Sequence, residues 1–234
     1  MIGNPWIELF DSNHTIYAND LHRQVHFKLI AKDISEFIWT KDTIVLDFCC
    51  GEALSANYVA SFCKKLFLIE PASSVLFNLK KRFSKNNKIA IYSMEEISEI
   101  SDQTIDMVVM HSVIQYMTSD ELEEALSHIK RILSPKGIFI LGDVIPPDSN
   151  AITDAISLLN FGKKNGFLLP AILTLIKTFF SKYRKLRTKY GLFNYSDEQI
   201  LEILSRIGFK TSRRPRNIGH NQSRKTYQSQ IDSK

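Results

Sequence analysis

The stretch of sequence that decides the fold is Val45-Leu46-Asp47-Phe48-Cys49-Cys50-Gly51-Glu52-Ala53. Its start belongs to an apolar, β-branched run over residues 43–48, which is typical of a strand buried on both faces. A tight turn of small residues follows and leads into a helix expected over residues 54–62. Small residues let a ligand come close to the backbone, and the helix N-terminus offers free amide donors. The stretch therefore predicts a ligand-binding turn at the carboxyl end of a buried strand.

Similar strand-like runs later in the chain predict the rest of a sheet. A turn at residues 134–137 is expected to open the last of them. The runs cover residues 66–69, 88–92, 105–110 and 138–141. Helical segments with short connections alternate with these runs, which is typical of an α/β, doubly wound, mainly parallel sheet. Ligands bind at the carboxyl ends of the strands in such sheets, so functional residues are expected directly after each strand.

The flanking helices have sequence signals at their ends. Asn19 or Asp20 can cap a helix that runs to Trp39, and Ser119 or Asp120 can cap the helix before the fifth strand. These side chains accept hydrogen bonds from amides of the first helical turn, which have no partner inside the helix.

The strand–helix rhythm changes after the fifth strand. Two helices are expected over residues 152–160 and 168–187. A helix capped by Ser196 follows, with strands near Lys210 and over residues 224–230. We therefore expect a single domain with an inserted helical cap. Its parts are an N-terminal helical segment (1–40), a core (41–147), a helical cap insertion (148–192), and a C-terminal helix with strands (193–234).

The composition indicates a globular chain with an uneven charge distribution. The 234 residues are 44% hydrophobic and 24% charged, which excludes disordered and fibrous proteins. Three cysteines cannot form a disulfide framework, and no secretory signal is evident, so a cytoplasmic location is expected. Residues 1–162 hold 14 Lys/Arg and 21 Asp/Glu, whereas residues 163–234 hold 16 and 4. The basic part indicates either an anionic partner or a solvated face that balances the acidic part.

A carboxylate also ends the second strand. Glu70 follows the turn by about twenty residues, a position from which a carboxylate can accept hydrogen bonds from ribose hydroxyls. The turn lacks the spacing of a dinucleotide-binding G-x-G-x-x-G motif and the Lys-Ser/Thr pair of a nucleoside triphosphate site, which disfavours both ligands. The alternative interpretation is that Asp47 only caps the turn and Glu70 only caps the helix that begins at Pro71.

Five segments, in order, resemble motifs of the class I S-adenosylmethionine (SAM) dependent methyltransferases. The resemblance implies a Rossmann-like methyltransferase fold with a seven-stranded, mainly parallel sheet, an N-terminal helix and a helical cap insertion. The matching segments are residues 47–53 (the glycine-rich D-x-G-x-G-x-G turn), 68–71 (the acidic ribose-binding position), 106–116 (the fourth-strand motif), 133–140 (the L-x-P-G-G hairpin) and 195–209 (the late Y-S-x-E … G-F helix).

The resemblance implies that SAM is the cofactor. Asp47 would order the turn, Gly51 would let the carboxypropyl chain pass, and Glu70 would bind the ribose. The segment at residues 93–95 would frame the adenine, and His111 would lie beside the methyl donor. The residues assigned to SAM are Asp47, Cys49, Gly51, Glu70, Ser93, Met94, Glu95 and His111.

The turn departs from the family pattern at two positions. Cys49 and Ala53 stand where the first and third glycines are expected, so only Gly51 is in place. Cys49 fits poorly if its position needs a positive φ, whereas a methyl group at Ala53 is expected to cost little at the start of a helix. A thiolate at Cys49 or Cys50 near a helix N-terminus is a further hypothesis. We expect both instead to be small packing residues.

Candidate residues for the methyl acceptor follow from the same arrangement. A base is useful where the acceptor carries a proton, and the candidates are His111, Asp143 and His220. Residues expected to contact substrate or the SAM carboxylate are Tyr17, Arg23, Gln115 and Tyr116. His22 and His26 share a helix face, but no further ligand accompanies them, and no metal site is expected.

The segment over residues 161–190 joins an apolar stretch to a basic one. Its longest apolar run covers 14 residues, fewer than the roughly 20 that a membrane-spanning helix needs. We expect a lid packed on the core, with a helix lying on a membrane surface as the alternative. Its aromatic residues indicate room for an apolar acceptor; they are Phe161, Phe167, Phe179, Phe180, Tyr183 and Tyr190.

The sequence therefore predicts transfer of a methyl group from SAM to oxygen or nitrogen of a small or medium-sized acceptor, which is apolar or anionic. An RNA methyltransferase is the alternative encouraged by the basic C-terminal part, but the fourth strand lacks the N/D-P-P-Y/F run of base methylases. A SAM-binding module without turnover is the third hypothesis.

Overall fold

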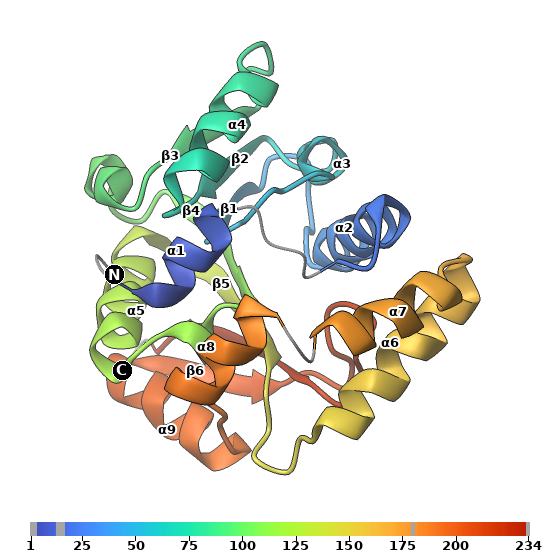
Figure 1. Ribbon diagram of the computed structural model, residues 1–234. Helices are drawn as coiled ribbons and strands as arrows, with labels where there is room; N and C mark the ends of the chain where they lie inside the picture. The colour runs from blue at the N-terminus through green and yellow to red at the C-terminus, as the bar shows by residue number, and fades with distance from the viewer. Residues whose placement is uncertain (1–3, 13–16, 179–180, 233–234) are drawn as a thin grey trace.

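The computed structural model describes residues 4–12, 17–178 and 181–232, so Phe179 and Phe180 lie outside the described residues. The described residues form one seven-stranded sheet with strand order β3-β2-β1-β4-β5-β7-β6, in which β7 alone runs opposite to the other strands (Figure 1). This confirms the predicted α/β fold. The strands are β1 (Ile44–Phe48), β2 (Lys65–Ile69), β3 (Ile89–Tyr92), β4 (Ile105–His111), β5 (Leu133–Val144), β6 (Phe209–Arg213) and β7 (Lys225–Ile231).

Helices cover both faces of the sheet. On one face, α5 (Ser119–Ile132), α9 (Asp197–Ile207) and the 3₁₀ helix η1 (Glu95–Glu99) bury their apolar side chains. On the other face lie α2 (Asp20–Ser35), α3 (Ala56–Ala60) and α4 (Ser73–Phe83). The central strands are buried on both faces for this reason, which explains their continuous apolar sequence.

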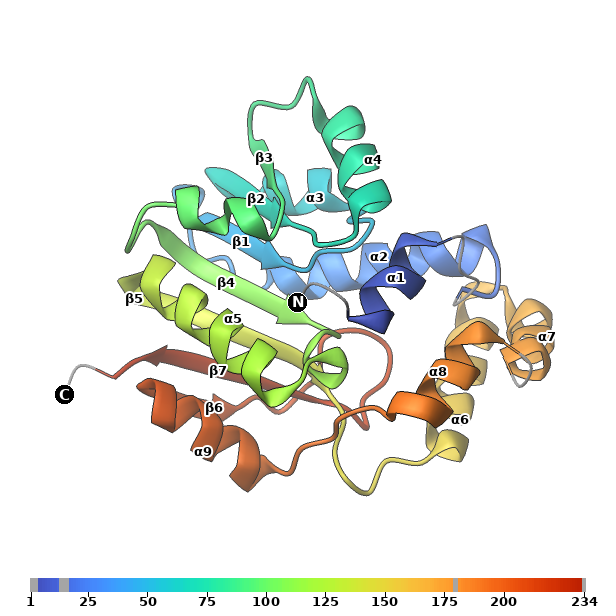
Figure 2. The same cartoon turned by 60° about the vertical axis from the view of Figure 1, so that its left-hand side comes forward.

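The remaining helices gather at the carboxyl ends of the strands. They are α1 (Pro5–Asp11), the short 3₁₀ helix η2 (Ile114–Tyr116), α6 (Ala151–Asn165), α7 (Leu168–Thr178) and α8 (Lys182–Tyr190). Figure 2 shows α1 and α8 beside the ends of the central strands, with the hairpin of α6 and α7 projecting beyond them. The strand order reverses between β1 and β4, which is where such sheets bind ligands.

Several element boundaries differ from the predicted ones. The helix expected over residues 54–62 is only α3, and the helix expected to reach Trp39 ends at Ser35. The helix expected over residues 168–187 is two helices, α7 and α8, and the Ser181 side chain caps the second by accepting from the Arg184 amide.

Two further predictions were wrong for identifiable reasons. The turn expected at residues 134–137 is a bulge inside β5, because the register with β4 shifts there and Ser134 Oγ lies 3.3 Å from the carboxylate of Asp106. The cap of α5 is Thr118, which forms a capping box with Glu121. Asn19 and Ser196 are confirmed as caps of α2 and α9. Helix α1 was not predicted, although Asn4 and Pro5 are a cap and first-turn signal.

A buried carboxylate anchors the loop between β6 and β7 to α2. Asp33, whose side chain is 5% exposed, accepts hydrogen bonds from the Arg216 guanidinium at 2.9 Å and from the Gly219 amide at 2.8 Å. Glu36 lies one helical turn later, 4.0 Å from the same guanidinium, and its side chain is 55% exposed. The two carboxylates therefore face one cation from very different environments.

We expect Asp33→Ala to lower the free energy of unfolding by about 1–3 kcal/mol, because it leaves the buried Gly219 amide without its acceptor. Glu36→Ala is the matched control and should change it by less than about 0.5 kcal/mol, since exposed ion pairs contribute little. Urea unfolding with both variants measures the difference. Equal midpoint shifts would contradict the anchoring role of Asp33.

Candidate active site

A cavity of about 510 Å³ lies at the carboxyl ends of β1, β2, β4 and β5. Residues from α1, α2, α6 and α8 complete its walls, together with the loop that follows β6. Of the sequence-predicted site residues, those that line it are Asp47, Cys49, Gly51, Glu70, His111, Gln115, Tyr116, Asp143, Tyr17 and His220. The fold therefore brings most of the predicted site residues together in one cavity.

The turn after β1 has an unusual backbone. Cys49, Gly51 and Ala53 have φ angles of 56°, 58° and 40°, in the left-handed region that favours glycine. The three positions of the family's glycines thus keep a glycine-like backbone although two of them carry side chains. The expectation that Ala53 opens a helix was wrong, because α3 begins at Ala56 and Ala53 belongs to the strained turn.

Glu70 holds this turn. One carboxylate oxygen accepts from the Gly51 amide at 2.8 Å, and the other accepts from the Ala72 amide at 2.8 Å. Burial raises the pKa of Glu70 to about 7, although the two amide donors pull it down. Pro71 lies before the helix, since α4 begins at Ser73. Glu70 therefore caps no helix directly but joins the ends of β1 and β2.

Asp47 provides a second carboxylate at the same end of the cavity. Burial raises its pKa to about 7, and the nearby Glu70 carboxylate adds to the shift. No hydrogen bond to the Asp47 carboxylate is found within the described residues, so it is Glu70 that orders the turn. Asp47 is therefore available to a cationic ligand group.

Neither cysteine in the turn is a reactive thiolate. Burial raises the pKa of both the Cys49 and the Cys50 thiols well above the usual range, and the carboxylates of Asp47 and Glu70 raise them further. The thiols remain protonated at neutral pH, which agrees with their expected role as small packing residues.

The other end of the cavity is built on the ends of β4 and β5. Ser112 and Asp143 have φ angles of 58° and 62°, and the Ser112 hydroxyl donates to the Asp143 carboxylate at 2.6 Å. Asn217 fixes Asp143 in turn, because its side-chain oxygen accepts from the Asp143 amide at 3.1 Å and its Nδ2 lies 3.3 Å from the carboxylate. Asp143 is thus held by three bonds.

His111 ends β4 opposite a glycine of β5. A Cβ atom at Gly142 would come within 3.0 Å of the His111 ring and 3.3 Å of Ile218, so only glycine leaves room for the imidazole. The Nε2 atom of His111 lies 3.3 Å from the Ile218 carbonyl oxygen. The ring is therefore positioned from both sides.

Three more histidines surround this end. The His220 ring stacks on Phe161 with centroids 4.5 Å apart, and His22 stacks on Phe167 at 4.7 Å. His26 lies between them, and burial together with the neighbouring imidazoles lowers its pKa well below the usual range. Burial lowers the pKa of His220 and brings that of His22 to about 4. These three histidines are therefore neutral at pH 7.

The described residues contain no group of three or more His, Cys, Asp or Glu arranged to hold a metal ion. His22 instead accepts a hydrogen bond from the Ala18 amide at 3.0 Å through Nδ1. His22 and His26, which share one face of α2, therefore belong to a cluster of aromatic rings that includes Phe161 of α6 and Phe167.

Aromatic residues from α1, η2 and α8 line another wall of the cavity. The Trp6 ring lies 4.8 Å from Tyr116 and 5.6 Å from Tyr183. Hydrogen bonds tie α1 at both ends, from Asn4 to the Tyr116 carbonyl at 3.0 Å and from the Ser74 amide to Asp11 at 2.6 Å. Tyr17 adds a half-buried phenol, and desolvation raises its pKa. This wall is apolar and partly closed.

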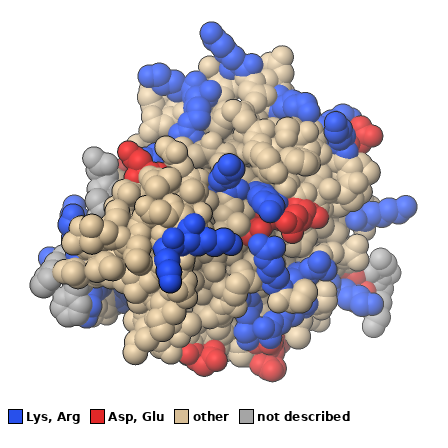
Figure 3. Space-filling view, turned by 90° about the vertical axis from the view of Figure 1, so that its right-hand side faces the viewer, with Lys and Arg blue, Asp and Glu red and all other residues tan. Residues whose placement is uncertain are grey.

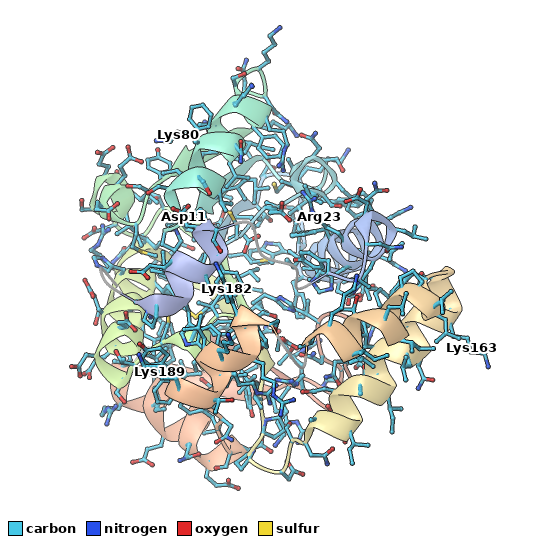
Figure 4. All side chains as sticks on the ribbon, viewed as in Figure 1. Asp11, Arg23, Lys80, Lys163, Lys182 and Lys189 are labelled. Atoms are coloured by element: carbon cyan, nitrogen blue, oxygen red, sulfur yellow. The ribbon has the colours of Figure 1, made fainter. Side chains whose placement is uncertain are left out.

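Four predicted residues do not line the cavity. Arg23 is engaged by Glu52, with its Nε and NH2 atoms 2.8 and 2.6 Å from the two carboxylate oxygens, and braces α2 against the turn (Figure 4). The other three lie after β3, outside the cavity walls; they are Ser93, Met94 and Glu95. Their assignment to adenine stays a prediction.

Buried polar atoms without partners occur among the side chains that line the cavity. Within the described residues they include Nδ1 of His26, Oε1 of Gln115 and Nε of Arg224, and all three side chains line the cavity. Arg224 bonds Asp154 through NH2, with both oxygens at 2.8 Å. Arg224, Asp154 and Asn217 were missed because they come from the irregular loop and the insertion, where spacing carries no signal.

Comparisons with known proteins agree with this geometry. Residues 46–141 match the family model of the methyltransferase domain. An uncharacterized methyltransferase of Schizosaccharomyces pombe is 22% identical over 197 residues, which cover 76% of this chain and 69% of that protein. A probable S-adenosylmethionine-dependent methyltransferase of Saccharomyces cerevisiae is 25% identical over 204 residues, covering 82% of this chain and 65% of that protein.

The fold is similar to that of DhpI, solved as a complex with SAH. The TM-score is 0.59 at 8% sequence identity, over 97% of this chain and 96% of the other. Identity at this level shows a shared fold, whereas the match to the methyltransferase domain covers residues 46–141. With its strained turn after β1 and the Glu70 carboxylate beside it, the chain carries at residues 46–141 a methyltransferase domain of the class I, SAM-dependent kind.

Proposed function

We propose that this methyltransferase moves the methyl group of SAM to an oxygen or nitrogen atom of a small or medium-sized acceptor with an apolar body. The observation that carries the proposal is a single cavity with two chemically different ends. One end presents Asp47 and Glu70 beside the strained turn. The other presents neutral imidazoles and buried polar atoms without partners, next to an apolar wall.

The residues of the first end fit SAM. Glu70 keeps lone pairs free beyond its two amide bonds and can accept from ribose hydroxyls, as the sequence analysis expects. Asp47 can accept from the ammonium group of the amino acid part, because the described residues leave its carboxylate without a donor. The backbone of Gly51 has open space where a Cβ would stand, so the chain of the ligand can pass.

SAM supplies an electrophilic methyl group on a positively charged sulfur atom when it is bound. The protein's contribution is to hold the acceptor in line with that methyl group in a site that excludes water. His111, on the strand next to β1, lines the cavity at the carboxyl end of β4. In this proposal its ring, held by Gly142 and the Ile218 carbonyl, accepts a proton from the acceptor or orients it.

The acceptor end favours a group that carries a proton. His26 and His220 are neutral, so each can accept a hydrogen bond through one ring nitrogen, and the unpartnered Nδ1 of His26 accepts from a donor when Nε2 carries the proton. Gln115 Oε1 is a second acceptor without a donor. A hydroxyl or amine of the acceptor satisfies such atoms, while Trp6 and Phe10 contact its apolar part.

Incubation with methyl-labelled SAM and fractionated cell extract tests the proposal. Label should enter the small-molecule or lipid fraction. Label confined to RNA would support the nucleic-acid alternative, and SAM binding without label in any fraction would show a binding module without turnover. Either result would overturn the proposed acceptor class.

Glu70→Gln should weaken SAM binding by about 1–3 kcal/mol, which is roughly 5- to 150-fold in Kd, because one acceptor for the ribose or for a backbone amide is lost. Glu123→Gln, on the exposed side of α5, is the control and should leave Kd unchanged. Titration calorimetry measures both. Equal affinities of wild type and Glu70→Gln would contradict the placement of SAM.

The raised carboxyl pKa of Glu70 predicts opposite pH effects on stability and on SAM binding. Its stabilising contribution to the SAM-free protein is complete below a pH of about 4.5 and is lost as pH rises through about 7. Donors on SAM favour the ionised carboxylate, so affinity should rise over the same range. Asp47 acts in the same direction.

We therefore expect the SAM-free protein to become less stable, and SAM to bind more tightly, between about pH 7 and 8. The three neutral histidines act in the opposite direction near pH 6.5, because their imidazoles bind protons in the unfolded chain and not in the folded protein, so the effect of Glu70 is measured as the difference between wild type and Glu70→Gln. The pH dependence of the free energy of unfolding and the pH dependence of SAM affinity should both be smaller in Glu70→Gln. Thermal unfolding and calorimetry across the window measure them, and a SAM affinity that falls with pH would refute the assignment.

His111→Asn should lower kcat by about 100-fold or more if the ring transfers the proton, with the Kd of SAM changed by less than about twofold. Asparagine keeps a polar group but cannot act as the base. Equal losses in kcat and SAM affinity would instead show that His111 positions the cofactor. Calorimetry and steady-state rates on the same preparation separate these outcomes.

A further inference from the structure

The outer side of α7 is made of aliphatic side chains. Five of them are exposed and form what we call the aliphatic face: Leu168, Leu169, Ile172, Leu173 and Ile176. At about 100° per residue they span an arc of about 140° around the helix. Lys177 is the only other exposed residue described on α7, and it lies at the edge of this arc. Exposed patches of this kind mark interaction surfaces.

The aliphatic face is presented by a packed helix. On the opposite side of α7, Ala171 is fully buried against Gly162 of α6, where a Cβ would come within 3.2 Å of it. Phe167, at the start of the helix, is fully buried and stacks on His22 of α2. The back of α7 is thus anchored to the molecule, and burial of its outer side needs an external partner.

Positive charge lies beside the aliphatic face. Residues 151–178, which form the hairpin of α6 and α7, contain three lysines and one acidic residue, Asp154, which is bonded to Arg224. Lys163 and Lys164 lie at the turn between α6 and α7, and Figure 4 shows Lys163 projecting from the far end of the hairpin. Figure 3 shows more Lys and Arg than Asp and Glu side chains on the side of the molecule that carries this end.

We propose that the aliphatic face and the lysines beside it dock the enzyme on an anionic lipid surface. A helix with an aliphatic side and a basic rim lies in the membrane interface, with its apolar side in the boundary between headgroups and acyl chains. Each lysine near such a surface adds attraction to anionic lipids. Protein interfaces favour aromatic and arginine anchors at their centre, whereas this face offers only Leu and Ile.

The docking is peripheral. None of the helices in the described part of the chain is long and apolar enough to cross a bilayer. The end of α7 lies next to the cavity, since Thr178 and Ser181 line it, and Leu158 of α6 lines it as well. Docking through α7 therefore brings the acceptor end of the cavity close to the lipid surface.

Vesicle sedimentation of the full chain without SAM tests the docking, and the result does not depend on the proposed acceptor. Wild-type protein should bind vesicles of phosphatidylcholine with phosphatidylglycerol at low salt and should bind phosphatidylcholine alone at least about tenfold more weakly. Raising the salt concentration should weaken binding to the anionic vesicles.

Leu169→Asn/Ile176→Asn removes the two most exposed aliphatic side chains of α7, which are 66% and 59% exposed. Binding to the anionic vesicles should fall by at least about tenfold. The matched control is Phe77→Asn/Leu201→Asn, which changes two exposed apolar side chains on α4 and α9 and should leave binding unchanged. Lys163→Gln/Lys164→Gln should also weaken binding by about tenfold or more, without touching the aliphatic face.

Three results would overturn the proposal. The first is no binding of the folded wild-type protein to anionic vesicles. The second is an equal loss in the control variant. The third is concentration-dependent self-association that Leu169→Asn/Ile176→Asn abolishes, in the absence of vesicle binding, which would assign the face to a second copy of the chain. Unchanged thermal unfolding midpoints of the variants ensure that these results do not reflect misfolding.

Discussion

The Glu70 carboxylate, shared between the Gly51 and Ala72 amides, is the contact on which the turn after β1 depends. The turn after β1 holds Cys49 and Ala53 in a backbone region that side chains disfavour, and each such residue costs on the order of 1 kcal/mol or more. A buried carboxylate that accepts hydrogen bonds from two amide N–H groups offsets part of this cost. The same carboxylate lines the cavity, so the group that maintains the turn is also the group that we propose binds the ribose.

A second set of contacts maintains the end of the cavity at β4 and β5, and it comes from distant parts of the chain. Asp33 of α2 holds Gly219, Asn217 holds Asp143, and the Ile218 carbonyl meets His111. The loop between β6 and β7 is thus pinned on three sides, which carries His220 into the cavity. The conformation of this loop depends on side chains more than 70 residues away in sequence. A substitution in α2 that removes its contact with the loop should therefore also change the position of His220.

This difference explains what the sequence could reveal. The turn at residues 47–53 and Glu70 were predictable because strand periodicity, small residues and the carboxylate position are local signals. Asn217 and Arg224 were not, since they lie in a loop and at a strand start where no spacing distinguishes a site residue from a solvated one. Helix α1 was missed although Asn4-Pro5 is a local signal, because its length leaves little periodicity to detect.

The basic residues of the C-terminal part (163–234) have different surroundings in the structure, which the sequence does not reveal. The sequence alone is compatible with any anionic partner. In the structure, Arg216 and Arg224 are paired with Asp33 and Asp154 and so stabilise the fold, whereas the lysines of the hairpin face solvent beside aliphatic side chains. A nucleic-acid groove would need its cations without such an apolar neighbour, because phosphates gain nothing from Leu and Ile. The aliphatic side chains of α7 and the lysines beside them therefore fit a lipid layer, which is apolar inside and anionic at its surface.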